Sequence, residues 1–215
     1  MDEKLKIVGL MYVGAVLFVN GLMLLGKVDG KSAGVFNLFI GAIQVITSFY
    51  LIFTAGGEPW AIFDASGVFL FGLTYLYVGI SNLKDLDFSG IGWYSLWVAI
   101  LALGYSYISF TQFHDIKFGV IWIMWSFLST LFYLLLACKK DIGAFTGWVS
   151  LTQAWVTATI PAFLTLIGKW GLIGPQLTWI ITFLICMTFI FLYWKTKTSV
   201  SKSNRVVTER LPKGS

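Results

Sequence analysis

Seven long apolar stretches, each almost free of charged residues, follow one another through this chain. Each is close to the roughly 20 residues that an α-helix needs to cross the ~30 Å hydrocarbon core of a bilayer. Only α-helices and closed β-barrels satisfy their backbone polar groups in lipid, and these stretches do not alternate polar and apolar residues as barrel strands do. We therefore predict an all-α polytopic membrane protein, a bundle of helices. The predicted spans are 7–25, 33–55, 61–82, 93–113, 118–138, 145–168 and 177–194.

The composition agrees with this class. Of the 215 residues, 58% are hydrophobic and 12% are charged, whereas roughly 25% of the residues in a typical soluble domain are charged. No segment is long enough for a sizeable domain outside the membrane. The first 25 residues are as apolar as a signal peptide, but the run is too long and no cleavage motif of small residues follows it, so we expect a first span.

The distribution of Lys and Arg predicts the orientation of the spans, because cytoplasmic loops carry an excess of both. The loops after the first, third and fifth spans and the C-terminal tail hold eleven of these residues, and the other side holds four. The first side is therefore expected in the cytoplasm of a bacterial cell, with the N-terminus outside, and the net charge of +5 reflects topology, not nucleic-acid binding. The eleven are Lys27, Lys31, Lys84, Lys139, Lys140, Lys195, Lys197, Lys202, Arg205, Arg210 and Lys213, and the four are Lys4, Lys6, Lys117 and Lys169.

Three of the expected cytoplasmic turns share a pattern: Lys, then Asp, then Ser or Thr shortly before a Gly and an aromatic residue. Ser and Thr are good helix N-caps, and Asp near a helix start suits the positive end of the helix dipole. The aspartates, Asp29, Asp87 and Asp141, are 58 and 54 residues apart. Either any turn at a membrane interface collects such residues, or one helical hairpin is repeated three times and the seventh span is an addition.

The polar residues inside the spans are uncharged. No Lys, Arg, Asp or Glu lies at the middle of a span, although ion pathways, proton relays and voltage sensors depend on such residues. The last span also lacks the Lys that a retinal protein needs. The spans instead contain Asn20, Asn37, Gln44 and Gln153, which either join helices together or bind a small, neutral, polar solute.

The aromatic residues divide by depth. Trp122 and Trp125 share one face of the fifth span, and Phe71 and Tyr75 share a face of the third. Such a stripe is either packing or the wall of a pore, and periodicity alone does not distinguish the two. The remaining tryptophans near span ends fit the aromatic belt of the membrane interface: Trp60, Trp93, Trp148, Trp170, Trp179 and Trp194.

Several motifs, in order from about residue 10 to 168, resemble those of the UreI/AmiS urea and amide channel family. They are YVGAVLFVNG (12–21), KVDGKS (27–32), NLFIG (37–41), FGLTYLY (71–77), WYSLWVAI (93–100), IWIMW (121–125), FTGW (145–148) and TATIPAF (157–163). The resemblance implies a six-helix protomer of three repeated hairpins, assembled as a homo-hexamer with one pore per protomer. On this basis residues 1–174 form the channel bundle, 175–194 an additional transmembrane helix and 195–215 a basic cytoplasmic tail.

By the same resemblance, aromatic faces sandwich a planar amide or urea in the pore, and polar side chains replace the hydrogen bonds to water that the solute loses. Aliphatic neighbours make a narrow slot that excludes ions, since desolvating a charge costs far more than desolvating a neutral amide. The implied pore lining is Val13, Leu17, Asn20, Phe71, Tyr75, Trp122, Trp125, Leu128 and Gln153.

The chain also departs from the urea channel of this family. Ser129 stands where that channel has a further pore Trp, and Gln153 replaces a carboxylate. The loop between the second and third spans is short and lacks the histidines associated with acid gating. His114, the single histidine, is expected to be an ordinary solvated loop residue, so we predict no acid-operated switch between pH 7 and 5.

We therefore expect a passive channel for urea or short aliphatic amides such as acetamide, feeding a cytoplasmic urease or amidase. The alternative is a non-conducting membrane sensor or interaction protein built on the same bundle. We expect no enzymatic activity, because the bundle holds no nucleophile–base pair, and no cofactor or metal site, because one histidine does not make one. The expected partners are the solute, membrane lipids and further copies of the chain.

Overall fold

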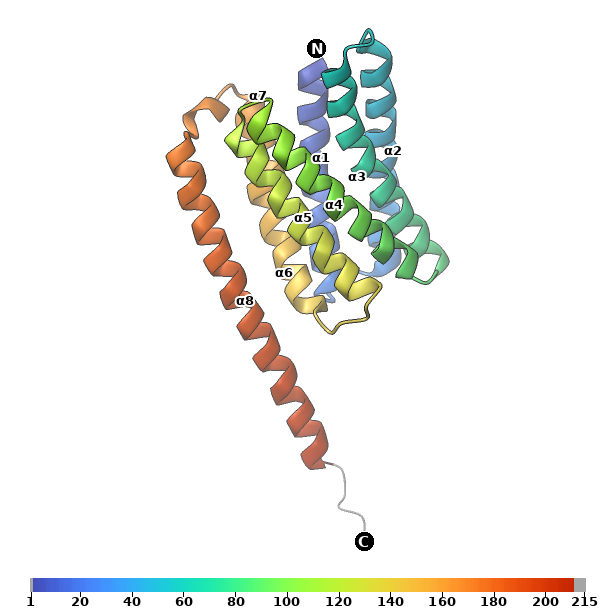
Figure 1. The fold of residues 1–215 in the computed structure, drawn as a ribbon. Coiled ribbons are helices and arrows are strands. Elements are labelled where there is room, and N and C mark those ends of the chain that lie inside the picture. The colour runs from blue at the N-terminus through green and yellow to red at the C-terminus, as the bar shows by residue number, and fades with distance from the viewer. Residues whose placement is uncertain (1, 211–215) are drawn as a thin grey trace.

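The computed structural model describes residues 2–210, with side chains from Lys4 to Thr198, and this part of the chain is helical without strands. The fold class predicted from the sequence is thereby confirmed (Figure 1). The elements are α1 (Asp2–Leu24), α2 (Gly30–Thr54), α3 (Pro59–Lys84), α4 (Ser89–Thr111), α5 (Ile116–Leu136), α6 (Gly143–Gln153), the π-helix η1 (Ala154–Thr159), α7 (Ile160–Leu166), the 3-10 turn η2 (Trp170–Leu172) and α8 (Pro175–Arg210).

Seven segments of the described chain are long and apolar enough to cross a membrane. They coincide with the seven predicted spans, and the sixth is a composite of α6, η1 and α7. The helix α8 continues past residue 194 as far as Arg210, so the predicted tail is helical up to that point. Residues 211–215 of the predicted tail lie outside the described residues.

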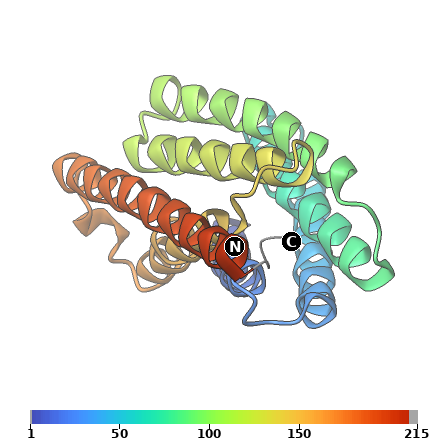
Figure 2. The same ribbon diagram turned by 90° about the horizontal axis from the view of Figure 1, so that it is seen from below.

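The six helical segments of the bundle pack as three tight pairs. The pairs are α2 with α3, α4 with α5, and α1 with the composite of α6, η1 and α7. The two helices of each sequence hairpin, such as α3 and α4, contact each other far less. Seen from below in Figure 2, the pairs surround the middle of the bundle, and α8 lies along its outside. The repeated hairpins therefore interlock, each giving one helix to each of two pairs.

Small residues bring the helices of each pair together. A Cβ atom added at Gly41 of α2 would lie 2.7 Å from the backbone nitrogen of Leu76 in α3, and one added at Gly92 of α4 would lie 2.5 Å from that of Ala137, beyond α5. In the third pair, Gly21 approaches the carbonyl oxygen of Gly147 in the same way. Close backbone approach of this kind is how helices associate in lipid, where no hydrophobic force drives them together.

The end that carries the turns after α1, α3 and α5 is here named the lower end, as in Figure 1, and the opposite end the upper end. Each of these turns contains a residue in the left-handed region: Gly26 (φ 68°), Asp85 (φ 52°) and Lys139 (φ 54°). Such residues commonly end helices, and the turns at the upper end contain them too, at Gly56, His114 and Gly168.

The predicted Ser and Thr N-caps are wrong in detail. Asp29 is itself the N-cap of α2, where its carboxylate accepts hydrogen bonds from the backbone N–H groups of Lys31 and Ser32. Thr146 lies within α6, and its hydroxyl donates to the Ile142 carbonyl. The Asp29 carboxylate also interacts favourably with the positive end of the α2 dipole.

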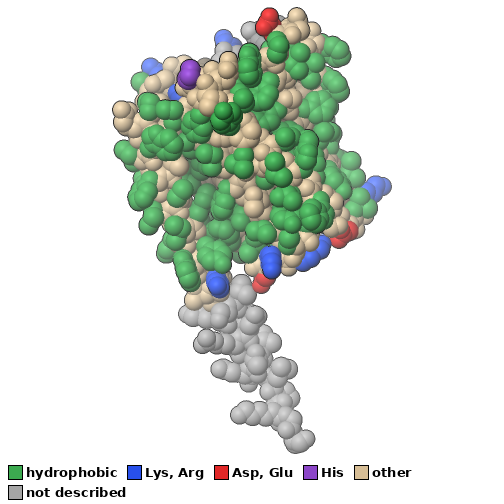
Figure 3. All heavy atoms as spheres, viewed as in Figure 1, with side chains coloured by type: hydrophobic (Ala, Val, Ile, Leu, Met, Phe, Trp, Pro, Cys, Tyr) green, Lys and Arg blue, Asp and Glu red, His purple; other side chains and the backbone are tan. Residues whose placement is uncertain are grey.

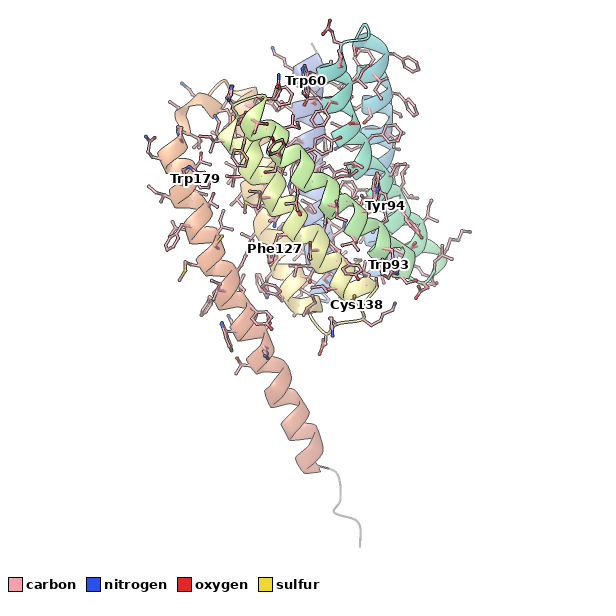
Figure 4. All side chains as sticks on the ribbon, viewed as in Figure 1. Trp60, Trp93, Tyr94, Phe127, Cys138 and Trp179 are labelled. Atoms are coloured by element: carbon pink, nitrogen blue, oxygen red, sulfur yellow. The ribbon has the colours of Figure 1, made fainter. Side chains whose placement is uncertain are left out.

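Charged side chains lie at the two ends of the bundle, and hydrophobic ones cover the face between them (Figure 3). At the lower end, Lys139 lies 3.3 Å from the Asp87 carboxylate. The pKa of Asp87 is lowered to about 2, first by hydrogen bonds from Ser89 and then by Lys139. Of the predicted belt residues, Trp60 and Trp179 lie near the upper end and Trp93 near the lower end (Figure 4). The charge-free middle is what a membrane-spanning protein requires.

Candidate functional site

Two cavities lie within the bundle between the odd-numbered helices α1, α3 and α5. The upper cavity is lined by Val13 and Trp122 among others, and the lower cavity by Leu17, Asn20, Tyr75 and Leu128 among others. Phe71 and Trp125 line both. Eight of the nine predicted pore residues thus lie on one cavity or the other, and Phe71 and Trp125 mark the boundary between the two.

The aromatic rings at this boundary pack against one another. The ring centroids of Phe71 and Trp125 are 4.8 Å apart at an interplanar angle of 74°, and those of Trp122 and Trp125 are 4.8 Å apart at 85°. A solute between two ring faces needs contact distances of about 3.5–4.0 Å on each side. The predicted sandwich is therefore not open in this conformation, and the two cavities are separated by an aromatic constriction.

Trp122 is held in place by a residue that the sequence did not single out. Its ring stacks on Tyr105 of α4 at a centroid distance of 4.4 Å, and a Cβ atom at Gly67 would lie 3.1 Å from the same indole. The Tyr105 hydroxyl lies 2.5 Å from the Ser66 hydroxyl. In the sequence, this arrangement could have been recognised from Gly67, one helical turn before Phe71. A glycine there leaves space for the large ring of Trp122.

Trp125 is fixed by the sixth span. Its indole N–H donates to Thr157 Oγ1 over 3.0 Å, and the Thr157 hydroxyl donates to the Gln153 carbonyl over 2.6 Å. Thr157 lies in the π-helix η1. Pro161 has no N–H group to continue the α-helical pattern, which gives a physical reason for the wider turn just before it. The π-helix η1 thus positions Thr157 Oγ1, the hydrogen-bond acceptor of Trp125, behind the aromatic constriction.

Gln153, the ninth predicted residue, lines neither cavity. It is fully buried, and its Nε2 donates to the Met124 carbonyl over 2.8 Å. Its Oε1 has no hydrogen-bond partner. In this structure Gln153 joins α6 to α5 behind the wall of the pathway.

Asn20 joins two helices and also lies on a cavity. Its Nδ2 donates to Asn37 Oδ1 over 3.0 Å, and Asn37 Nδ2 donates back to Asn20 Oδ1 over 2.6 Å. This reciprocal amide pair joins α1 to α2. Asn20 also lines the lower cavity, so its amide borders the pathway.

Further polar groups on the cavities were not selected as site residues. Gln44 lines the upper cavity, where its Nε2 donates to the Gly9 carbonyl over 3.3 Å and its Oε1 is left without a partner. Thr74, Ser95 and Ser129 line the lower cavity. The small side chain of Ser129 there fits the predicted loss of a pore Trp. The sequence marked Gln44 as a polar residue inside a span, but the direction in which it faces depends on how α2 packs.

The mouth of the upper cavity is charged. Lys6 of α1 forms an ion pair of 2.8 Å with Asp64 of α3, and both residues line the cavity together with Asp115, the N-cap of α5. Across the side chains from Lys4 to Thr198, no three His, Cys, Asp or Glu residues gather in a way that could hold a metal ion. The site therefore offers aromatic faces, amides and hydroxyls inside, and charges only at its upper mouth.

Residues 5–169 match the sequence profile of the AmiS/UreI family transporters. The chain belongs to the AmiS/UreI family. Among curated members of this family, it is 53% identical over 163 residues to the transporter protein AmiS2 of Rhodococcus erythropolis, covering 75% of this chain and 79% of that one. It is 32% identical to the acid-activated urea channel of Helicobacter pylori, covering 75% of this chain and 97% of the relative.

Solved structures of an AmiS/UreI protein show the same fold. The crystal structure of the Helicobacter pylori urea channel superposes with a TM-score of 0.68 at 32% identity, covering 76% of this chain and 98% of that one. Its cryo-EM structure in the closed state gives a TM-score of 0.71 at 30% identity, with 77% and 99% covered. The family match ends before α8, so the seventh span lies outside the shared part.

Proposed function

We propose that this protein is a passive channel for urea and short aliphatic amides. The observation that carries the proposal is the pair of cavities, one toward each end of a membrane-spanning bundle, that meet at Phe71 and Trp125. A relative named as a transporter of amidate substrates and one named as an acid-activated urea channel support the solute class. The chain itself carries out no chemistry; it provides a route to a urease or amidase in the cytoplasm.

The lining favours a neutral, planar solute. Aliphatic and aromatic side chains form most of both cavities, so a hydrated ion would lose its water without replacement, at a prohibitive cost. An amide loses far less, and the Asn20 amide in the lower cavity is placed to exchange hydrogen bonds with it. Passage requires the Phe71 and Trp125 rings to rotate apart, because their centroids are only 4.8 Å from each other.

The distribution of charge supports an orientation for the channel in the membrane, and the family resemblance supports a mode of assembly. The upper end faces the outside of a bacterial cell membrane and the lower end the cytoplasm, since Lys27, Lys31 and Lys84 lie at lower-end turns. Six copies form a ring with one pore in each, as the family resemblance implies. Of the nine residues named from the sequence, eight line the proposed pathway, and Gln153, which lines neither cavity, joins α6 to α5 behind it.

Uptake by proteoliposomes tests the function. Stopped-flow light scattering of vesicles containing the purified protein is expected to show faster entry of urea or acetamide than empty vesicles, with no increase in Na⁺ or Cl⁻ conductance. A protein that is folded and oligomeric but conducts neither solute would overturn the channel and favour the non-conducting sensor. The ratio of the two rates ranks urea against acetamide.

A further inference from the structure

The charged residues that line the upper cavity are one cation, Lys6, and two carboxylates, Asp64 and Asp115. Lys6 lies 2.8 Å from Asp64 Oδ2 and neutralises it. Asp115 is engaged differently, because its Oδ1 accepts a hydrogen bond from the backbone N–H of Phe118 at the start of α5. Within the described side chains no Lys, Arg or His forms an ion pair with Asp115. The cavity thus has one cation set against two carboxylates.

The ion pair joins two helices that pack little against each other. α1 packs against α6, η1 and α2, and α3 packs against α2 and, less, against α4. Lys6 and Asp64 reach toward each other from these two walls of the upper cavity. Their side chains remain 29% and 46% exposed, and ion pairs with this much solvent contribute little to folding. A role in folding therefore does not explain the pair.

Charge at this mouth decides which solutes collect in the cavity. The mouth lies above an aromatic constriction that selects by shape, and shape alone does not separate urea from guanidinium, its planar cationic analogue. Carboxylates bind guanidinium through two parallel hydrogen bonds, one of the strongest arrangements available to a protein. A cavity with two unpaired carboxylates would hold this cation and block the route of the neutral solute.

We propose that Lys6 is a specificity-determining residue: by pairing with Asp64 it keeps planar organic cations, guanidinium foremost, from occupying the upper cavity. This inference rests on the proposed channel function. In this proposal, Lys6 at the mouth discriminates between urea and guanidinium. The rings of Phe71 and Trp125 discriminate between solutes by size.

Guanidinium inhibition of urea uptake tests the inference, because four proteins differ stepwise in the charge of the cavity. Lys6→Met leaves two carboxylates uncompensated, the double variant Lys6→Met/Asp64→Asn leaves one, and Asp64→Asn leaves a cation against one carboxylate. The half-inhibitory guanidinium concentration is expected to fall about threefold or more in Lys6→Met, to return close to the native value in the double variant, and to rise in Asp64→Asn. Matched NaCl additions correct for ionic strength.

Salt and a neighbouring lysine provide the controls. The differences are expected at an ionic strength of about 0.01 M and to disappear near 1 M, where the Debye length falls from ~30 Å to ~3 Å. Lys4→Met removes the same charge two residues away, from an exposed side chain that does not line the cavity, and is expected to match the native protein.

Equal inhibition of the native protein and Lys6→Met at low ionic strength, with urea uptake intact, would overturn the role of Lys6. If the native protein itself conducts no urea, the proposed function fails separately. Binding of ¹³C-labelled guanidinium to the detergent-solubilised variants, followed by NMR line broadening, then still decides whether Lys6 excludes the cation. The same order of affinities supports the inference, and equal affinities contradict it.

Discussion

Trp125 combines three constraints in one side chain. It lines both cavities, packs edge-on against Phe71, and donates its indole N–H to Thr157 in the π-helical turn. With only 6% of its surface exposed, it is held as firmly as a core residue. Because this packing resists the ring rotation that passage requires, we propose that Trp125 limits the size of solute that can pass.

Shortening this residue is expected to weaken selection by size. In Trp125→Ala the two cavities merge, so uptake of a bulkier amide such as butyramide should rise at least severalfold relative to urea. Stopped-flow uptake of both solutes measures the ratio, and Trp97→Ala, which removes a half-exposed ring of α4, is the control. A large core truncation lowers the free energy of unfolding by about 3–5 kcal/mol. Trp125→Phe is therefore a second, less disruptive variant, and it should keep most of the selectivity by solute size. An unchanged ratio in a folded Trp125→Ala protein would mean that the ring only packs.

Acid is not expected to open or close the channel. Asp87 at the lower end has a pKa lowered to about 2. A carboxylate with a depressed pKa stabilises the fold above its unfolded-state pKa, and this stability is lost only as pH falls toward 2, well below the range from 7 to 5. His114, exposed in the turn between α4 and α5, lines neither cavity. Uptake rates at pH 7 and 5 should therefore agree, and His114→Ala should leave both rates unchanged. A several-fold rise in uptake on acidification, abolished by His114→Ala, would contradict the absence of an acid-operated switch.

The sequence predicted the depth of each site residue better than its facing direction. Phe71 could be placed on one face with Tyr75, and Trp125 on one face with Trp122, because α3 and α5 are regular helices. The direction of Gln153 could not be predicted, because it depends on how α6 packs against α5, where Gln153 Nε2 donates to the Met124 carbonyl.

At the scale of helices, the α2/α3 pair depends on glycines at the crossing. In Gly41→Ala the new Cβ atom would meet the backbone of Leu76 at 2.7 Å and of Gly72 at 3.0 Å, so the helices must separate. We expect a loss of about 1–3 kcal/mol of stability, typical of overpacking, seen as a lower Tm in detergent. Gly104→Ala on α4 is the matched control, because no atom lies within 4 Å of the added Cβ and alanine favours a helix. An equal Tm for both variants would show that the α2/α3 crossing tolerates a wider separation.

The pairing of helices was less accessible from the sequence than their number. Hydropathy and length define seven spans independently of their neighbours, which is why their bounds agree with the structure. Which helices pack closely depends on where glycines such as Gly92 meet a partner backbone, and this requires the three-dimensional arrangement. The pattern shared by the turns around Asp29 and Asp87 therefore indicated a repeated hairpin, but it did not indicate which helices pair closely.

For the whole molecule, the orientation in the membrane is the prediction that remains to be measured. The native Cys138 is exposed at the lower end, and His114 is exposed at the upper end. In intact cells a membrane-impermeant maleimide should label a His114→Cys variant and leave Cys138 unlabelled until the cells are opened, with Cys186→Ser removing the second native thiol. Labelling of Cys138 from outside would reverse the topology.

The pairing of α1 with the sixth span has a consequence for biogenesis. The Ser150 hydroxyl donates to the Leu17 carbonyl across 133 positions of the chain, and Gly21 meets Gly147 at the same crossing. α1 therefore leaves the ribosome well before its closest partner, which follows only after four further spans have been inserted. Until then its glycine face remains against lipid or translocation machinery, so we expect the bundle to close late, and a chain truncated before α6 leaves α1 without its closest partner.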